Sequence, residues 1–130
     1  MIQQATDTKV ITILLIDDNP TFRACLARVF ESEPGYRLAA VAASGEEALR
    51  LPRTLAPDVV LLDLYLPDGF GLALIGFLKA RWPGCRVVVL SLEDAVLCIE
   101  AALAAGADDY IPKRYTTERL LPAIQRAVHG

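Results

Sequence analysis

Residues 10–18 read Val-Ile-Thr-Ile-Leu-Leu-Ile-Asp-Asp, a nearly continuous run of apolar and β-branched residues that ends in two acids. Such a run is typical of a strand buried on both faces, because a strand with one wet face alternates apolar and polar side chains. Asn19 follows as a candidate N-cap, and Pro20 suits the first position of a helix. Apolar residues then recur at helical spacing until Pro34 and Gly35, so the stretch predicts a strand joined directly to a helix.

The alternation of buried runs and amphipathic segments continues to the end of the chain. Further strands are expected at residues 38–43, 58–63, 86–91 and 108–111. Helices are expected at 44–51, 72–82 and 94–105, and from a cap at Thr116 or Thr117 onward. Strands that alternate with helices in this way form a parallel sheet with helices on both faces. The sequence therefore predicts an α/β fold with a doubly wound, five-stranded parallel sheet.

The composition excludes several classes of protein. The chain has 130 residues, of which 54% are hydrophobic and 22% charged, and this balance rules out intrinsic disorder. A net charge of −3 argues against nucleic-acid contact by this domain, because phosphate contacts need clustered Lys and Arg. No segment approaches the ~20 apolar residues of a membrane span, and residues 1–8 read as a polar tail without a signal peptide's apolar region. The three cysteines form no C-x-x-C pair, so a reducing cytoplasm is expected.

Polar residues gather at the carboxyl ends of the expected strands, where parallel α/β sheets bind ligands. They are Asp17 and Asp18 after the first strand, Asp63 after the third, Ser91 at the end of the fourth and Lys113 after the fifth. Each alone is more often a turn former, a helix cap or a solvated charge. Together, the carboxylates predict a divalent cation, and oxygen-only ligands favour Mg²⁺ or Mn²⁺ over zinc. A carboxylate beside such a cation, a Lys and a hydroxyl can attack phosphorus and form an aspartyl phosphate.

The ordered motifs resemble the receiver domain of bacterial two-component response regulators, over residues 9–128. The resemblance rests on Ile16-Asp17-Asp18-Asn19, on Asp63-Leu64-Tyr65-Leu66-Pro67-Asp68-Gly69, on Leu90-Ser91 and on Asp109-Tyr110-Ile111-Pro112-Lys113. It implies a flavodoxin-like (βα)5 fold and one receiver domain over residues 1–130. The Leu-Pro-Asp-Gly-Phe-Gly loop at 66–71 is similar to that of receivers joined to LuxR-type helix-turn-helix domains. The chain is thus either a stand-alone receiver or, as its ending favours, the receiver part of a longer regulator whose output domain is absent from this chain.

The resemblance also implies the roles of the acidic residues. Asp63 would be the phosphoacceptor. Asp17 and Asp18 would hold Mg²⁺, Asp18 more directly, and Asp63 with the backbone carbonyl of Tyr65 would complete the protein's share of the coordination. The phosphoryl group would come from a sensor histidine kinase or a phosphotransfer protein, or from a small phosphodonor.

The remaining site residues are assigned by the same resemblance. Ser91 would hydrogen-bond the phosphoryl group, and Lys113 would pair with it. Tyr110 would be the switch aromatic that turns inward when Ser91 moves. The altered face would be built from the fourth helix, the fifth strand and the fifth helix, and a homodimer that forms on phosphorylation is an open option.

Three residues depart from the family's usual pattern. Pro112 precedes Lys113 rather than following it, so the Lys113–Arg114 peptide is expected to be trans or strained. Leu92 stands after Ser91 where a small residue is common, and the bulky Tyr65 stands two residues after Asp63. We expect Tyr65 and Leu92 to restrict access of water to the phosphoryl site.

Three functions remain to be weighed. The favoured one is a phosphorylation-dependent signalling switch that catalyses its own phosphoryl transfer but is not a turnover enzyme. The second is an aspartyl-phosphate phosphohydrolase, against which stands Tyr65, because such enzymes typically place an acid two residues after the nucleophile. The third is a degenerate receiver that acts only as a protein-interaction module, against which stands the presence of the full set of site residues.

Overall fold

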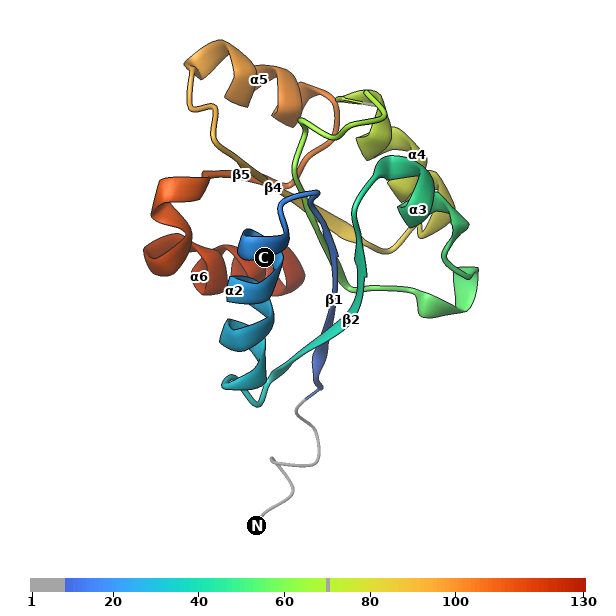
Figure 1. The fold of residues 1–130 in the computed structure, drawn as a ribbon, viewed down its shortest axis with the longest axis vertical. Helices are drawn as coiled ribbons and strands as arrows, with labels where there is room; N and C mark the ends of the chain where they lie inside the picture. Colours follow the sequence, from blue (N-terminus) through green and yellow to red (C-terminus); the bar gives the residue numbers. More distant parts are fainter. Residues whose placement is uncertain (1–8, 70) are drawn as a thin grey trace.

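The computed structural model describes residues 9–69 and 71–130, and a parallel sheet of five strands lies between two layers of helices (Figure 1). The strands are β1 (Ile11–Ile16), β2 (Tyr36–Ala42), β3 (Val59–Leu62), β4 (Arg86–Ser91) and β5 (Asp109–Pro112). The helices are α2 (Pro20–Glu31), α3 (Gly45–Arg50), α4 (Ala73–Arg81), α5 (Val96–Ala104) and α6 (Thr116–His129), with 3-10 turns η1 (Arg53–Leu55) and η2 (Lys113–Tyr115). The strand order is β2-β1-β3-β4-β5, which confirms the expected doubly wound fold. The polar tail expected at residues 1–8 lies outside the described residues.

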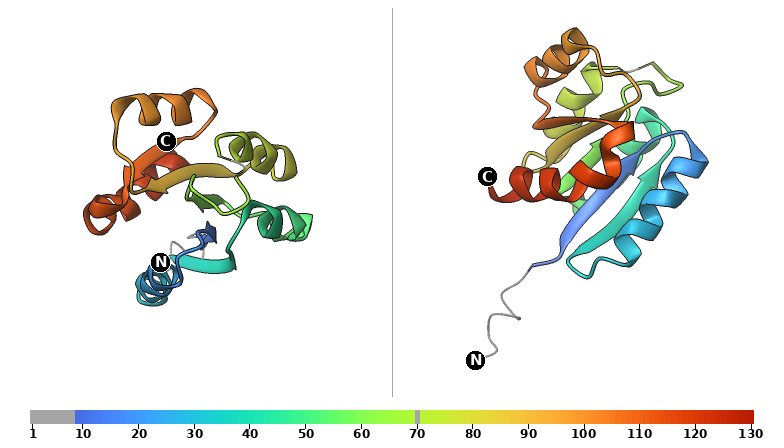
Figure 2. Two further views of the ribbon diagram at one scale, coloured as in Figure 1. Left: turned by 45° about the horizontal axis from the view of Figure 1, so that its top comes forward. Right: turned by 90° about the vertical axis from the view of Figure 1, so that its left-hand side faces the viewer.

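The apolar run of β1 serves two separate cores. Ile13 and Leu15 face the layer of α2 and α6, whereas Leu14 and Ile16 face the layer of α3, α4 and α5. All four side chains are at most 1% exposed. Figure 2 shows the two helical layers on opposite sides of the sheet. Because successive side chains of a strand point to opposite faces, a strand covered on both sides must be apolar at almost every position.

Most strands differ by one or two residues from the expected bounds. β2 begins at Tyr36, two residues before the expected start, because Tyr36 pairs with Ile11 across the sheet. The pairing with β1 shifts by one residue between Ile13 and Leu14. The extra residue in β2 interrupts the alternation of inward and outward side chains, so the strand is harder to recognise in the sequence. β5 covers Asp109–Pro112 instead of residues 108–111.

Two helix starts also differ from the expectation. α5 begins at Val96 rather than at Asp94, since the Asp94 carboxylate pairs with Arg114. The expected caps of α6, Thr116 or Thr117, are wrong. Tyr115 precedes that helix without a side-chain cap, and the Thr116 hydroxyl donates to the carbonyl of Lys113 at 2.7 Å. Asp94 and Thr116 have side chains that can cap a helix, but each bonds to another group instead, Asp94 to Arg114 and Thr116 to the carbonyl of Lys113.

Two further expectations concern the chain as a whole. Cys25, Cys85 and Cys98 are free thiols in the structure, with Cys25 exposed and Cys85 buried. Over residues 9–69 and 71–130, no helix is both long enough and apolar enough to span a bilayer.

Candidate phosphorylation site

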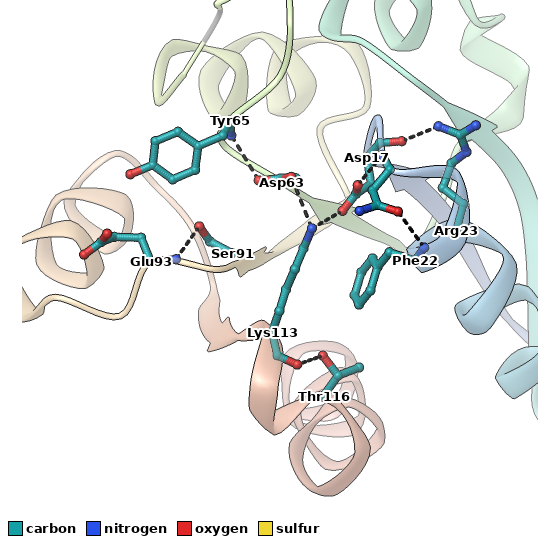
Figure 3. A network of polar contacts seen from close by, with 10 residues as sticks. Asp17, Phe22, Arg23, Asp63, Tyr65, Ser91, Glu93, Lys113 and Thr116 are labelled. Carbon is teal, nitrogen blue, oxygen red and sulfur yellow. Dashed lines mark hydrogen bonds and ion pairs between the residues drawn. The ribbon is translucent and has the colours of Figure 1, made fainter.

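The carboxyl ends of β1, β3 and β5 bring two acids and a lysine together (Figure 3). Lys113 Nζ lies 2.7 Å from Asp17 Oδ2 and 3.3 Å from Asp63 Oδ2. The side chains are nearly enclosed, with 10% of Lys113, 1% of Asp17 and 9% of Asp63 exposed. One buried ammonium thus offsets part of the negative charge of two buried carboxylates. The order of the strands produces this arrangement, and no local sequence pattern encodes it.

Backbone N–H groups fix the orientation of both acids. The N–H of Asn19 donates to Asp17 Oδ1 at 2.8 Å, and the N–H of Tyr65 donates to Asp63 Oδ1 at 3.0 Å. In each case the donor lies two residues after the acid, as in an Asx turn. Each carboxylate therefore has one oxygen held by its own loop, and its second oxygen faces Lys113.

The three carboxylates meet the requirements of a hard divalent cation. Oxygens of Asp17, Asp18 and Asp63 lie within 4.8 Å of one another, with Asp18 exposed to solvent. Asp17 Oδ2 is buried and accepts no hydrogen bond of good geometry from the described residues, although it forms the ion pair with Lys113. A buried carboxylate oxygen with spare acceptor capacity, beside two more carboxylates, fits the oxygen ligands that Mg²⁺ prefers.

Burial and neighbouring charges set the electrostatics of Asp63. Burial raises the pKa of Asp63 above its ordinary value, the Tyr65 N–H and the charge of Lys113 oppose this rise, and the neighbouring Asp17 adds to it. The carboxylate is thus poorly solvated, and a bound cation would favour its ionised form.

Ser91 and Tyr110 both bond to the backbone of Glu93, one at its N–H and the other at its carbonyl. The hydroxyl oxygen of Ser91 accepts the N–H of Glu93 at 3.2 Å, and the Tyr110 hydroxyl donates to the carbonyl of Glu93 at 2.6 Å. Ser91 is fully buried, and Tyr110 is only 7% exposed, so the tyrosine already points inward. Both expected switch residues therefore meet at the loop between β4 and α5.

Tyr65 and Leu92, which follow Asp63 and Ser91 closely in the chain, are both exposed to solvent. They are 61% and 80% exposed, whereas Asp63 is 7% exposed. The ring of Tyr65 extends away from the Asp63 carboxylate, toward the side where Ser91 and Glu93 lie (Figure 3). The Lys113–Arg114 peptide, like every peptide bond of the described residues, is trans.

Two residues of α2 belong to the site although sequence reasoning did not assign them. The Lys113 ammonium lies 4.4 Å from the centre of the Phe22 ring, a distance typical of a cation–π contact. Arg23 Nη1 donates to the carbonyl of Asp17 at 2.8 Å. The spacing of Phe22 indicated a core position, and only the tertiary structure shows that its ring also supports the lysine.

Known proteins share both the sequence and the fold. The family model of the response regulator receiver domain matches residues 13–125. The nitrate/nitrite response regulator protein NarL of Escherichia coli is 35% identical over 92% of this chain and 55% of its own length, and the regulatory protein DegU of Brevibacillus brevis is 32% identical over 100% and 55%. The chain thus spans about half the length of these relatives. The crystal structure of a LuxR-family two-component response regulator from Aurantimonas sp. is 31% identical, with a TM-score of 0.84 over 92% of this chain and 86% of that one.

Proposed function

This chain belongs to the response regulator receiver family, and from that premise we propose that it is a phosphorylation-dependent switch with Asp63 as its phosphoacceptor. The observation that carries the proposal is the shared ion pair, in which Lys113 lies 2.7 Å from Asp17 and 3.3 Å from Asp63 at one edge of the sheet. This edge supplies a nucleophile, a cationic partner for a phosphoryl group and a set of oxygen ligands. The full set argues against a degenerate receiver.

The residues divide the phosphoryl transfer among them. One carboxylate oxygen of Asp63 attacks phosphorus while the bond to the donor's nitrogen or oxygen breaks, and the leaving group takes the electron pair. Lys113 pairs with a phosphoryl oxygen, and the Ser91 hydroxyl donates to another. Asp17, Asp18, Asp63 and the carbonyl of Tyr65 would hold Mg²⁺, which supplies positive charge that offsets the negative charge of the transferred group.

The switch follows from the contacts of Glu93. When Ser91 turns its hydroxyl to the phosphoryl group, the geometry of its bond with the Glu93 N–H changes. The loop before α5 then moves, and Tyr110 follows through its bond to the Glu93 carbonyl. The phosphoryl group thus favours one of two loop arrangements by contacts that exist in only one of them.

The chemistry is tested with acetyl phosphate and Mg²⁺. The wild-type chain should gain one base-labile phosphoryl group, and Asp63→Asn should gain none. Asp109→Asn is the matched control, because Asp109 lies at the opposite end of β5 from Lys113. Mass spectrometry that places the group on Ser91 or Thr21 would overturn the assignment of Asp63.

The switch is tested by hydrogen exchange. Phosphorylation should change exchange over α5, β5 and the start of α6 in the wild type. Ser91→Ala should still accept phosphate but lose most of this response, because the hydroxyl that joins the two arrangements is gone. Equal responses in both proteins would contradict the route through Ser91.

The physiological setting belongs to the same proposal. In the cytoplasm, a sensor histidine kinase or a phosphotransfer protein would supply the phosphoryl group. A DNA-binding output domain in a longer protein would respond to the change, with dimerisation on phosphorylation as one route. Relatives named NarL and DegU, and a LuxR-family structure, support this setting. A sustained release of phosphate from small phosphoesters over many turnovers would favour a phosphohydrolase instead.

A further inference from the structure

A carboxylate from the loop after β3 completes the N-terminal cap of α3. Asp68 Oδ2 accepts the N–H of Glu46 at 2.8 Å, and Asp68 Oδ1 accepts the N–H of Gly45 at 3.3 Å. The partners are 22 and 23 residues apart in the chain. Asp68 therefore links the loop that carries Asp63 to a helix that lies outside the phosphorylation site.

The local cap of α3 leaves these two N–H groups to Asp68. Ser44 Oγ accepts the N–H of Glu47 at 3.1 Å, and the Glu47 carboxylate accepts the N–H of Ala43 at 2.9 Å. This arrangement is close to a capping box, except that Glu47 bonds to the residue before the cap instead of to the cap residue itself. The first N–H groups of a helix have no partner within it, so Gly45 and Glu46 need an acceptor from elsewhere.

The turn around Asp68 is itself well defined. The N–H of Gly69 donates to the carbonyl of Leu66 at 3.1 Å, and Gly69 adopts a φ of 69°, which side chains rarely tolerate. Leu66 is 7% exposed and packs in the core beneath α4. The loop is thus fixed at Asp63 and at Leu66, and Asp68 fixes its outer turn.

The residues that follow α3 are held by side chains from the end of α4. Arg81 Nε donates to the carbonyl of Leu51 at 2.9 Å, and Trp82 Nε1 donates to the carbonyl of Arg53 at 3.1 Å. Figure 1 shows α3 beside α4, from which Arg81 comes. Since α3 is bound at both ends, it provides a firm support for the loop rather than a mobile one.

We propose that Asp68 is a positioning residue, which holds the loop of Asp63 and Tyr65 against α3 and so couples the phosphorylation site to the first turn of that helix. The part of this inference that concerns Mg²⁺ binding rests on the proposed function. Because linkage is reciprocal, Mg²⁺ at the site should also stabilise the contacts of Gly45 and Glu46 with Asp68. The face of α3 would then respond to occupancy, in addition to the face of α5 and β5.

The test compares two variants that remove cap contacts from the same helix. Asp68→Ala removes the bonds between the loop and α3, whereas Ser44→Ala removes a cap bond within the α3 segment and leaves the loop's bonds to α3 in place. By magnesium titration followed through amide shifts, Asp68→Ala should weaken Mg²⁺ binding by about tenfold. Ser44→Ala should stay within about twofold of the wild type, and Asp68→Asn, which keeps one acceptor oxygen, should lie between them. The amides of Gly45 and Glu46 should shift with Mg²⁺ in the wild type but not in Asp68→Ala.

A second readout needs no metal. Without Mg²⁺, hydrogen exchange of residues 63–69 should be faster in Asp68→Ala and unchanged in Ser44→Ala. Equal exchange of this loop in the wild type and Asp68→Ala, or an equal effect of Ser44→Ala on it, would overturn the positioning role. A wild type that binds no Mg²⁺ would instead refute the proposed function, and the exchange experiment would still decide the role of Asp68.

Discussion

Lys113 faces two carboxylates that burial leaves poorly solvated, with Asp17 at 2.7 Å and Asp63 at 3.3 Å. Loss of one partner from a buried ion pair is costly, because the remaining charges stay out of water. In the presence of a chelator, Lys113→Ala should lower the free energy of unfolding by about 3 kcal/mol. Urea denaturation measures this loss.

Magnesium should then restore more stability to Lys113→Ala than it adds to the wild type, because the cation replaces the missing positive charge. The matched control is Lys79→Ala, whose ion pair with Asp108 lies at the surface, with 31% and 22% of the side chains exposed. That loss should be about 0.5 kcal/mol and should not depend on Mg²⁺. An equal magnesium increment in the wild type and Lys113→Ala would show that Lys113 does not share the charge of the metal site.

Tyr65 and Leu92 are predicted to set the lifetime of the phosphorylated state. Hydrolysis requires a water in line with the bond between phosphorus and Asp63, and the acid itself is only 7% exposed. Tyr65→Ala and Leu92→Ala should each speed the loss of phosphate by about tenfold, or about 1.4 kcal/mol in barrier. The test is the rate at which the phosphoryl group is lost, measured with saturating Mg²⁺. Unchanged decay in both variants would mean that neither side chain lies near the path of the water.

At the scale of elements, α6 contains a proline in its interior that destabilises the helix. Pro122 lies inside the helix Thr116–His129 and is exposed. Proline has no N–H for the carbonyl of Glu118 four residues earlier, and its ring crowds that carbonyl. Pro122→Ala should therefore raise the free energy of unfolding by about 1 kcal/mol, since the cost of an interior proline is partly offset by the freer unfolded chain.

Thr117→Ala, at an exposed position of the same helix, is the control for this substitution, and it should change stability by less than about 0.5 kcal/mol. Chemical denaturation of the three proteins provides the comparison. A lower stability of Pro122→Ala would show that the proline directs the path of α6 instead of straining it.

The elements also show where prediction from sequence succeeds. Ligands of parallel sheets lie at the carboxyl ends of strands, so Asp17, Asp63 and Lys113 could be brought together from strand order alone. The tie between Asp68 and Glu46 could not, because it joins residues 22 apart through two loops whose path depends on tertiary packing. The late start of α5, at Val96 instead of Asp94, also involves a contact between distant residues, since Asp94 pairs with Arg114.

At the scale of the whole molecule, the sheet is apolar on both faces and places its charged groups at one edge. Burial raises the pKa of Asp63 above the ordinary 3.8, even with Lys113 beside it. Well below pH 3.8 both folded and unfolded chains hold this proton, so Asp63 carries no penalty there. As the pH rises through 3.8, the unfolded chain loses its proton first, and stability falls until the pH passes the raised pKa of the folded state.

Asp63→Asn removes this penalty and is therefore expected to melt above the wild type at pH 7 in a chelator. The advantage should shrink as the pH falls through the raised pKa of the folded state and should vanish well below pH 3.8, where the wild-type acid is neutral in both states. Magnesium should reverse the order at pH 7, because a ligand that binds only the folded wild type stabilises it by mass action. Asp109→Asn, which loses an ion pair with the exposed Arg126, should show neither effect. If Asp63→Asn melts below the wild type in chelator, the attraction of Lys113 outweighs the cost of burying the acid, and the raised pKa of Asp63 does not govern stability.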